Sequence, residues 1–361
     1  MAKTVVWRVD PLAPAPEIIE WAAAILRAGG LVAFPTETVY GLGANALDPG
    51  AVAGIFRAKG RPPDNPLIVH VADRETVYRL ARRVDGRAVR LMELFWPGPL
   101  TLILPRQEGV PPEVSAGLET VAVRMPAHQA ALDLIRAAGV PVAAPSANLS
   151  GRPSPTTAAH VWDDLGEQID VILDAGPAGI GVESTVLDLT ASVPVILRPG
   201  GVTREELEAA AGEVRLDPAA GGGGEDAGSA GKDGPAAVSR PRSPGMKYRH
   251  YAPRAPLILV EGEARQAAAK VRELAELKSA AGLKVGILAS AEAAPFYPRG
   301  EILAAGSRRQ PEQIAARLFS ALRRFDELGV DVIIAEGVEP AGLGLAVMNR
   351  LRRAAAEVIT V

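Results

Sequence analysis

One long interruption in the apolar pattern, between Pro218 and Pro244, divides the chain. Gly221 to Gly224 open it, and alanine, aspartate, serine and lysine follow without a helical or strand period. Such a stretch cannot bury enough apolar surface to offset the entropy of ordering it, which is typical of a flexible linker. The chain is therefore limited to two folding units. We predict a first domain, a linker with a pocket-covering segment, and a second domain at residues 1–216, 217–255 and 256–361.

The first unit mixes helical and strand patterns irregularly. Helical periods occur at 17–28, 50–58, 74–83, 86–95, 127–138, 156–165 and 203–211. Strand-like runs occur at 31–34, 67–71, 100–104, 120–125, 141–144, 170–174, 183–189 and 194–198. Neighbouring strands with no helix between them, as at 183–198, favour a mixed twisted sheet over a purely parallel one.

The second unit alternates regularly. Strands are predicted at 256–260, 284–289, 301–304, 331–335 and 357–361, and helices at 263–280, 311–328 and 343–356. This alternation predicts a small Rossmann-like α/β domain. It contains no cluster of side chains typical of catalysis.

Composition limits the function classes. The 361 residues carry 39 Lys and Arg against 42 Asp and Glu, a net charge of −3, so no overall basic field attracts nucleic acid. The chain has no cysteine, which excludes disulfides and thiolate chemistry. Neither a leader-like apolar region nor a run of about 18 apolar residues is present, so we expect a cytoplasmic protein without a membrane segment.

The stretch from Lys59 to Pro66, Lys-Gly-Arg-Pro-Pro-Asp-Asn-Pro, carries the clearest chemical signal. Arg57, Lys59 and Arg61 place three cations within five residues. The prolines stiffen the loop and the glycine allows close backbone approach. Stiffly held cations suit a polyphosphate or carboxylate, although a solvated basic loop has the same composition. Because prolines brace the loop, we expect it to keep its shape and stability when Lys59 or Arg61 is truncated.

Polar side chains also follow several predicted strands, where ligand sites gather. They are Thr36 and Thr38, Ser146 and Asn148, Ser184, and the arginines Arg124 and Arg198. Arginine suits bidentate capture of a carboxylate or phosphate. Taken singly, each is equally typical of a turn or a surface ion pair.

Three common signatures fail. Gly41-Leu42-Gly43 lacks the strand-to-helix context of a dinucleotide-binding loop. Gly231-Lys232 imitates the end of a phosphate-binding loop, but Asp233 stands where Ser or Thr is required. The four histidines, His70, His128, His160 and His250, lack metal-ligand spacing, so no metal site is predicted.

Together these motifs resemble the two-domain form of threonylcarbamoyl-AMP synthase, with an N-terminal YrdC-like domain. The resemblance rests on Pro35–Leu42, Lys59–Pro62, Asn65–Leu67, Trp96–Thr101, Val123–Pro126, Pro145–Asn148, Glu183–Val186 and Arg198–Gly200. Beyond the linker, Ser243–Pro253 matches a segment found only in the two-domain form. The insertion near 219–240 departs from the family pattern and leaves the linker's path open.

The resemblance implies a nucleotidyltransferase that makes L-threonylcarbamoyl adenylate and pyrophosphate from ATP, L-threonine and bicarbonate or CO₂. The product would feed threonylcarbamoyladenosine modification of tRNA through a downstream transferase machinery. Mg²⁺ would be held mainly by the ATP phosphates and water.

The resemblance also assigns residues. Lys59 and Arg61 would be catalytic. ATP would contact Arg61, Asn65, Thr120, Ser146, Asn148, Ser154, Arg198 and Tyr251. Threonine would contact Thr36 or Thr38, His70, Arg124, the Ala144 backbone and Ser184. Arg124 would take the amino-acid carboxylate, and Tyr251 would close over the nucleotide.

Two alternatives remain at the level of sequence. A YrdC-like domain could bind structured RNA on a basic concave face, but the net charge and the lack of basic runs disfavour this. Carbamoyl transfer from carbamoyl phosphate, as in related hydrogenase-maturation domains, would bring cysteine-rich zinc motifs, and this chain has no cysteine.

Overall fold

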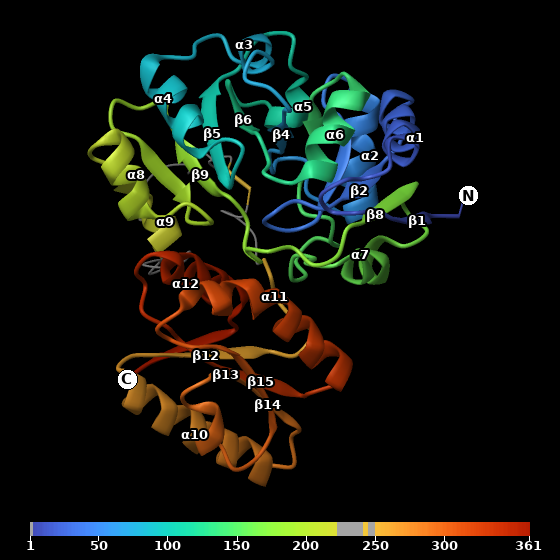
Figure 1. Ribbon diagram of the computed structural model, residues 1–361. Coiled ribbons are helices and arrows are strands. Elements are labelled where there is room, and N and C mark those ends of the chain that lie inside the picture. Colours follow the sequence, from blue (N-terminus) through green and yellow to red (C-terminus); the bar gives the residue numbers. More distant parts are fainter. Residues whose placement is uncertain (1–2, 222–240, 245–249) are drawn as a thin grey trace, which may run out of the picture.

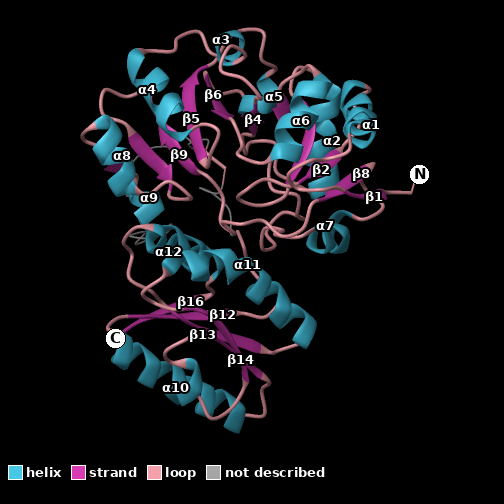
Figure 2. Ribbon diagram, viewed as in Figure 1, coloured by secondary structure: helices cyan, strands magenta, loops and turns pink. Residues whose placement is uncertain are grey.

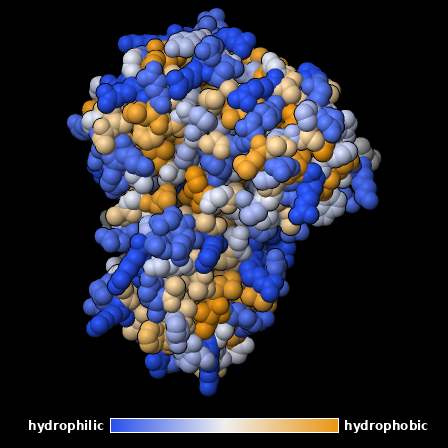
Figure 3. All heavy atoms as spheres, in the orientation of Figure 1, coloured by the Kyte–Doolittle hydropathy of each residue, from blue (hydrophilic) through white to orange (hydrophobic). Residues whose placement is uncertain are grey.

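The computed structural model describes residues 3–221, 241–244 and 250–361. These residues form two stacked units, each built on one sheet (Figure 1). On the face shown in Figure 3, hydrophilic side chains cover most of both units and apolar ones are scattered between them. Within the described ranges, no helix combines the length and apolarity needed to cross a bilayer.

Eleven strands form the first sheet, in the order β1-β8-β2-β3-β7-β4-β6-β5-β9-β10-β11. Their bounds are β1 Val5–Arg8, β2 Val32–Phe34, β3 Gly41–Asn45, β4 Ile68–His70, β5 Leu100–Pro105, β6 Thr120–Arg124, β7 Val142–Ala143, β8 Val171–Asp174, β9 Thr185–Asp188, β10 Val195–Arg198 and β11 Arg215–Leu216. Five neighbouring pairs are parallel and five are antiparallel. The predicted mixed sheet is confirmed.

Helices pack around this sheet. They are α1 Pro16–Arg27, α2 Pro49–Lys59, α3 Val77–Leu80, α4 Gly86–Phe95, α5 Pro112–Ser115, α6 Gln129–Ala138, α7 Ala158–Leu165, α8 Arg204–Ala211 and α9 Pro218–Gly221. Helix α2 shows how sequence sets the ends. The Asp48 side chain accepts from the backbone N–H groups of Gly50 and Ala51, and Gly60 ends the helix in the left-handed region, at φ 57°.

The second unit is an all-parallel sheet in the order β14-β13-β15-β12-β16. Its elements are β12 Leu257–Glu261, α10 Ala264–Ala280, β13 Val285–Ser290, the short 3₁₀ helix η1 Ala294–Phe296, β14 Glu301–Gly306, α11 Pro311–Leu328, β15 Val332–Glu336, α12 Leu343–Ala354 and β16 Glu357–Thr360. Helix α10 covers one face, while α11 and α12 lie between the sheet and the first unit (Figures 1 and 2). The predicted Rossmann-like architecture is confirmed.

The two units share an apolar core. Val39 and Val182 of the first unit belong to one buried cluster with Leu318 and Phe319 of α11. Gly181 is required there, because a Cβ built on it would lie 2.4 Å from the Ala315 carbonyl oxygen. The second unit is thus packed directly against the first.

The sequence missed some elements. Strand β1 shows no buried alternation, since all four of its residues are exposed. Strand β3 coincides with the glycine motif that failed as a nucleotide loop. A Cβ on Gly43 would lie 2.8 Å from the Phe34 ring and 2.9 Å from Val142, so close packing explains that glycine. The helix predicted at 74–83 is only the single turn α3.

The first residues of the predicted linker form helix α9, which packs near β10 and α12. The positions 222–240 and 245–249 lie outside the described residues. They include Lys232 and, in the predicted pocket-covering segment, Lys247. The domain limits proposed from sequence therefore stay a prediction.

Candidate active site

A pocket lies over the middle of one face of the large sheet, with about 710 Å³ of empty space including solvent at its mouth. Ile68 and His70 share this face because alternate strand residues do, and Arg124 lies opposite His70 in the β4–β6 pairing. Most predicted site residues line it, namely Thr36, Thr38, Lys59, Arg61, His70, Arg124, Ala144, Ser146, Asn148, Ser184, Arg198 and Tyr251.

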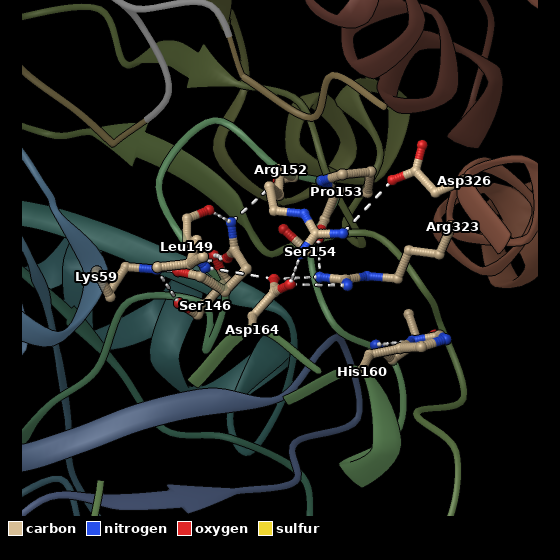
Figure 4. A network of polar contacts seen from close by, with 12 residues as sticks. Lys59, Ser146, Leu149, Arg152, Pro153, Ser154, His160, Asp164, Arg323 and Asp326 are labelled. Atoms are coloured by element: carbon tan, nitrogen blue, oxygen red, sulfur yellow. Dashed lines mark hydrogen bonds and ion pairs between the residues drawn. The ribbon is translucent and has the colours of Figure 1, made fainter. Parts of the chain in front are cut away.

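Lys59 is buried at the end of α2 and ties the helix to the loop after β7. Its Nζ donates to the Ser146 carbonyl oxygen at 2.5 Å and to the Asn148 carbonyl oxygen (Figure 4). Burial, followed by the neighbouring Arg61 charge, holds the lysine pKa well below its ordinary value. An anion beside Lys59 would favour its charged form again and so offset the cost of burying the charge.

Arg61 lies beside Lys59 and is held by the proline-rich loop. Its Nε donates to the Asn65 carbonyl oxygen at 3.2 Å and its Nη2 to the Pro66 carbonyl oxygen at 2.8 Å. Burial lowers its pKa to about 10. Asn65 is buried behind the pocket wall. Arg57 is exposed and does not line this pocket, so the structure brings together two of the three predicted cations.

The turn after β2 presents two threonines with different surroundings. The Thr36 hydroxyl donates to the Val39 carbonyl oxygen at 2.6 Å and shares a 2.8 Å hydrogen bond with the Thr38 hydroxyl. Thr38 in turn accepts from Arg124 Nη1 at 3.0 Å. Thr36 shapes the turn, whereas Thr38 joins the charged part of the pocket.

Arg124 and His70 form the inner wall. Arg124 pairs with Glu37, with 2.7 Å between Nη2 and Oε1. His70 packs edge-on against the Phe34 ring, and burial, then the Arg124 charge, lowers its pKa to about 3. The imidazole is therefore neutral near pH 7, and its buried Nδ1 has no hydrogen-bond partner among the described residues.

Arg198 and Ser184 form the opposite wall. The Arg198 guanidinium donates to the Ser184 carbonyl oxygen from Nε and Nη2, at 3.2 and 3.0 Å, and to its hydroxyl at 3.1 Å. Thr101 Oγ1 lies 2.8 Å from the same hydroxyl. Burial lowers the Arg198 pKa. Two backbone segments are thereby locked together at the pocket.

The sequence does not point to two charged residues here, Glu183 in this wall and Arg350 behind it. Glu183 Oε1 accepts from Ser154 Oγ at 2.5 Å, and Glu183 Oε2 lies 2.6 Å from Arg350 Nε. Glu183 lies in one of the motifs that carry the resemblance, which implies a role only for its neighbour Ser184. Arg350 lies 167 positions away on α12, where nothing in the sequence marked it.

A second buried network connects the pocket loop to the second unit (Figure 4). Asp164 on α7 accepts from Arg152 and pairs with Arg323 of α11 at 2.7 Å. Asp164 also accepts from the Leu149 N–H at 3.3 Å. Arg152 reaches Asp326 of α11 at 3.5 Å. This network and the Glu183–Arg350 pair therefore both connect the two units.

The remaining predicted residues take different places. Tyr251 lines the pocket with its backbone at φ 65°, and its ring lies 5.2 Å from the Phe319 ring. Thr120 begins β6, at the opposite end of that strand from Arg124, and does not line the pocket. Ser154 lies behind the residues that line the pocket, and its hydroxyl donates a hydrogen bond to Glu183.

The donor set does not fit a resident metal ion. Among the described residues, no three carboxylate or imidazole side chains group as metal ligands. The two carboxylates at the pocket are engaged, Glu37 by Arg124 and Glu183 by Arg350. Lys59, Arg61, Arg124 and Arg198 leave the pocket rich in cations, which suits a polyanionic ligand.

The fold and the pocket define the class: a YrdC-like α/β protein with a second, Rossmann-like unit. The chain belongs to the threonylcarbamoyl-AMP synthase family. Residues 24–200 match a family model described as telomere recombination, and residues 202–356 match the C-terminal domain of threonylcarbamoyl-AMP synthase.

Relatives match over nearly the whole chain. The threonylcarbamoyl-AMP synthase of Pyrococcus abyssi is 53% identical over 93% of this chain and 95% of its own. The Bacillus subtilis protein of that name is 50% identical over 98% of both. The crystal structure of P. abyssi Sua5 complexed with L-threonine superposes with a TM-score of 0.90, at 50% identity, covering 99% of this chain and all of that one.

Proposed function

We propose that this protein is an L-threonylcarbamoyladenylate synthase that uses ATP, L-threonine and bicarbonate or CO₂. The observation that carries the proposal is the convergence of Lys59, Arg61, Arg124 and Arg198 on one pocket. The full-length likeness to the threonine-bound P. abyssi structure supports it.

The reaction has two bond-forming steps. The threonine amine adds to CO₂ and loses a proton, which gives a carbamate. A carbamate oxygen then attacks the α-phosphorus of ATP, and the bond to the β-phosphate oxygen breaks to release pyrophosphate. Such a transfer depends on alignment and on neutralising charge, and needs no protein nucleophile. Buried, fixed cations suit that task because they need no reorganisation during reaction.

The geometry suggests how the substrates are divided. Lys59, Arg61 and Arg198 would hold the polyphosphate, with Ser146 and Asn148 beside Lys59. Arg124 would take the threonine carboxylate and Thr38 its polar atoms, since Thr36 is committed to its own turn. Neutral His70 would offer its buried Nδ1 to the threonine as a hydrogen-bonding atom. For Thr120 the structure offers no contact with this pocket.

Mg²⁺ would arrive with ATP, bound by phosphate oxygens and water, because the chain has no fitting cluster in its described part. The product is a reactive mixed anhydride, so a transferase that moves the threonylcarbamoyl group to tRNA adenosine must consume it. An RNA-binding module is disfavoured by the net charge of −3.

The decisive experiment is product analysis. With ATP, Mg²⁺, threonine and bicarbonate, we expect equal amounts of threonylcarbamoyl-AMP and pyrophosphate, and none when threonine or bicarbonate is omitted. Serine should react weakly, since one methyl group contributes only about 1–3 kcal/mol of discrimination. Pyrophosphate release that does not depend on threonine would contradict the proposal.

A further inference from the structure

Arg350 joins the second unit to the back of the pocket. It lies on α12, is fully buried, and its Nε donates to Glu183 Oε2 at 2.6 Å. Its Nη1 donates to the Pro199 carbonyl oxygen at 3.0 Å. One side chain from the second unit therefore forms hydrogen bonds with two separate segments of the first.

These two segments carry the pocket wall. Glu183 directly precedes Ser184, and Pro199 directly follows Arg198. The other Glu183 oxygen accepts from Ser154 Oγ. Arg350 thus contacts the immediate neighbours of Ser184 and Arg198 and, through Glu183, Ser154.

Arg350 is itself held rigidly. Its Nη1 donates to Asn349 Oδ1 at 2.7 Å, and Asn349 Nδ2 donates to the Ala220 carbonyl oxygen at 2.8 Å. Its guanidinium lies 5.3 Å from the centre of the Tyr251 ring, which lines the pocket. The guanidinium is therefore held by Asn349 of its own helix and by the ring of Tyr251.

A buried ion pair is a poor device for stability, because apolar side chains of similar size stabilise as well or better. The Glu183–Arg350 ion pair instead fixes the positions of the segments that it joins. Glu183 faces Arg350 from α12, Arg198 from β10, and His250 from the segment before the second unit, while Tyr251 of that segment faces the two arginines. Burial alone would raise the pKa of Glu183, but Arg350 and Arg198 together keep it below the ordinary value.

We propose that Arg350 is a positioning residue through which the second unit completes the active site. By fixing Glu183 and Pro199, it holds Ser184 and Arg198 at the pocket, with Ser154 bonded to Glu183 behind them. This inference rests on the proposed synthase function and assigns the second unit a part in it.

The test compares four single variants and one double variant of the full-length protein with wild type. Arg350→Met removes the pair at similar size, and Arg350→Lys keeps the charge but cannot reach both partners as the planar guanidinium does. Glu183→Gln removes the other charge. Arg308→Met is the matched control, since Arg308 lies 3.1 Å from the buried Glu336 and both residues belong to the second unit.

We expect Arg350→Met to lower kcat about a hundredfold, the loss typical of a misplaced active site, at saturating ATP and threonine. Arg350→Lys should lower kcat about tenfold, and Arg308→Met should keep wild-type kinetics. Combining Arg350→Met with Glu183→Gln should lose no more than the worse single variant, because both act on one contact.

A merely structural contact would lower the melting temperature and leave kcat of the folded fraction unchanged, and that result would overturn the inference. Additive losses in the double variant would overturn it as well. If Arg350→Met does not fold, Arg350→Lys is the deciding variant. A wild-type kcat in Arg350→Lys would contradict the inference. A wild-type protein that makes no threonylcarbamoyl-AMP would instead refute the proposed function.

Discussion

Arg124 already holds a carboxylate within the protein: its Nη2 lies 2.7 Å from Glu37 Oε1, and the two side chains are only 4% and 14% exposed. Arg124 Nε also donates to the Gly98 carbonyl oxygen at 3.2 Å. A substrate carboxylate at Arg124 must therefore share this guanidinium with Glu37 or displace it. In this arrangement Glu37 would compete with the carboxylate of a bound amino acid for Arg124.

Glu37→Gln should uncover this competition. Removing one partner of a buried pair leaves an uncompensated charge and costs about 3–5 kcal/mol. We expect a lower melting temperature without ligand, and a rise on adding threonine that exceeds the wild-type rise, because the substrate carboxylate replaces the lost one. Differential scanning fluorimetry with a threonine titration measures both.

The matched control is Glu119→Gln, which removes an exposed carboxylate paired with Arg82 and Arg106. Its threonine response should equal that of wild type. Equal responses in Glu37→Gln and wild type would show that Glu37 does not compete with the substrate.

Lys59 should make ATP binding take up protons. Burial lowers its pKa well below the ordinary value, and phosphate oxygens beside it would favour the charged form again. Below the ordinary lysine pKa there is then a pH range in which Lys59 is neutral in the free protein and becomes protonated on binding. Calorimetry in two buffers of different ionisation enthalpy measures this uptake, up to about one proton per ATP.

Two variants separate the sources of that proton. Lys59→Met should abolish the uptake. Arg57→Ala changes an exposed cation on the same helix and should leave it intact. Persistent uptake in Lys59→Met would assign the proton to another group.

His70 should make the protein sensitive to acid. Its pKa is about 3 in the folded protein and about 6.5 when unfolded, so the unfolded chain binds more protons between these values. This contribution to stability is complete above about pH 6.5 and is lost as the pH falls toward 3. One such group changes the unfolding free energy by at most about 1.4 kcal/mol per pH unit.

His70→Gln should therefore flatten the dependence of unfolding free energy on pH in this window by up to that amount. Urea unfolding at several pH values provides the slopes. His250 also has a pKa of about 3, so some acid sensitivity should remain. An unchanged slope would mean that His70 titrates normally in the folded state.

Much of the site could be predicted from local patterns. The turns after β2 and β7 bring Thr38 and Ser146 to one pocket because their strands lie in the middle of one sheet. The exposure of Arg57 follows from helical geometry, since residues two apart do not share a helix face with Lys59. The three cations therefore do not act as one loop, because Arg57 and Lys59 lie on different faces of a helix.

Other features depend on contacts that sequence does not encode locally. The sequence predicts that the stability of the braced loop survives truncation of Lys59, whereas its Nζ donates to the buried carbonyl oxygens of Ser146 and Asn148. The Ser146 oxygen also accepts from the Asn148 N–H at 3.1 Å, but truncation would remove the charged donor from both oxygens, so the structure favours a loss of stability. The Glu183–Arg350 pair depends on how two separate units pack, which no spacing in the chain reveals.

Gly200 should be indispensable for the pocket wall. A Cβ built on it would lie 2.2 Å from the Glu183 carbonyl oxygen and 2.4 Å from the Thr185 backbone nitrogen, so backbone would have to move. Gly200→Ala should therefore displace Ser184 from Arg198, lowering kcat/KM about a hundredfold and destabilising the protein by about 1–3 kcal/mol. Steady-state kinetics and thermal unfolding measure these effects.

Gly86→Ala is the control for that substitution. Gly86 is the first residue of α4, and a Cβ there meets nothing within 4 Å. Alanine suits a helix better than glycine by about 0.5–1 kcal/mol, so this variant should be fully active and as stable as wild type or slightly more so. If Gly200→Ala matched Gly86→Ala in kinetics, the contact between Gly200 and residues 183–185 would not control the position of the active-site wall.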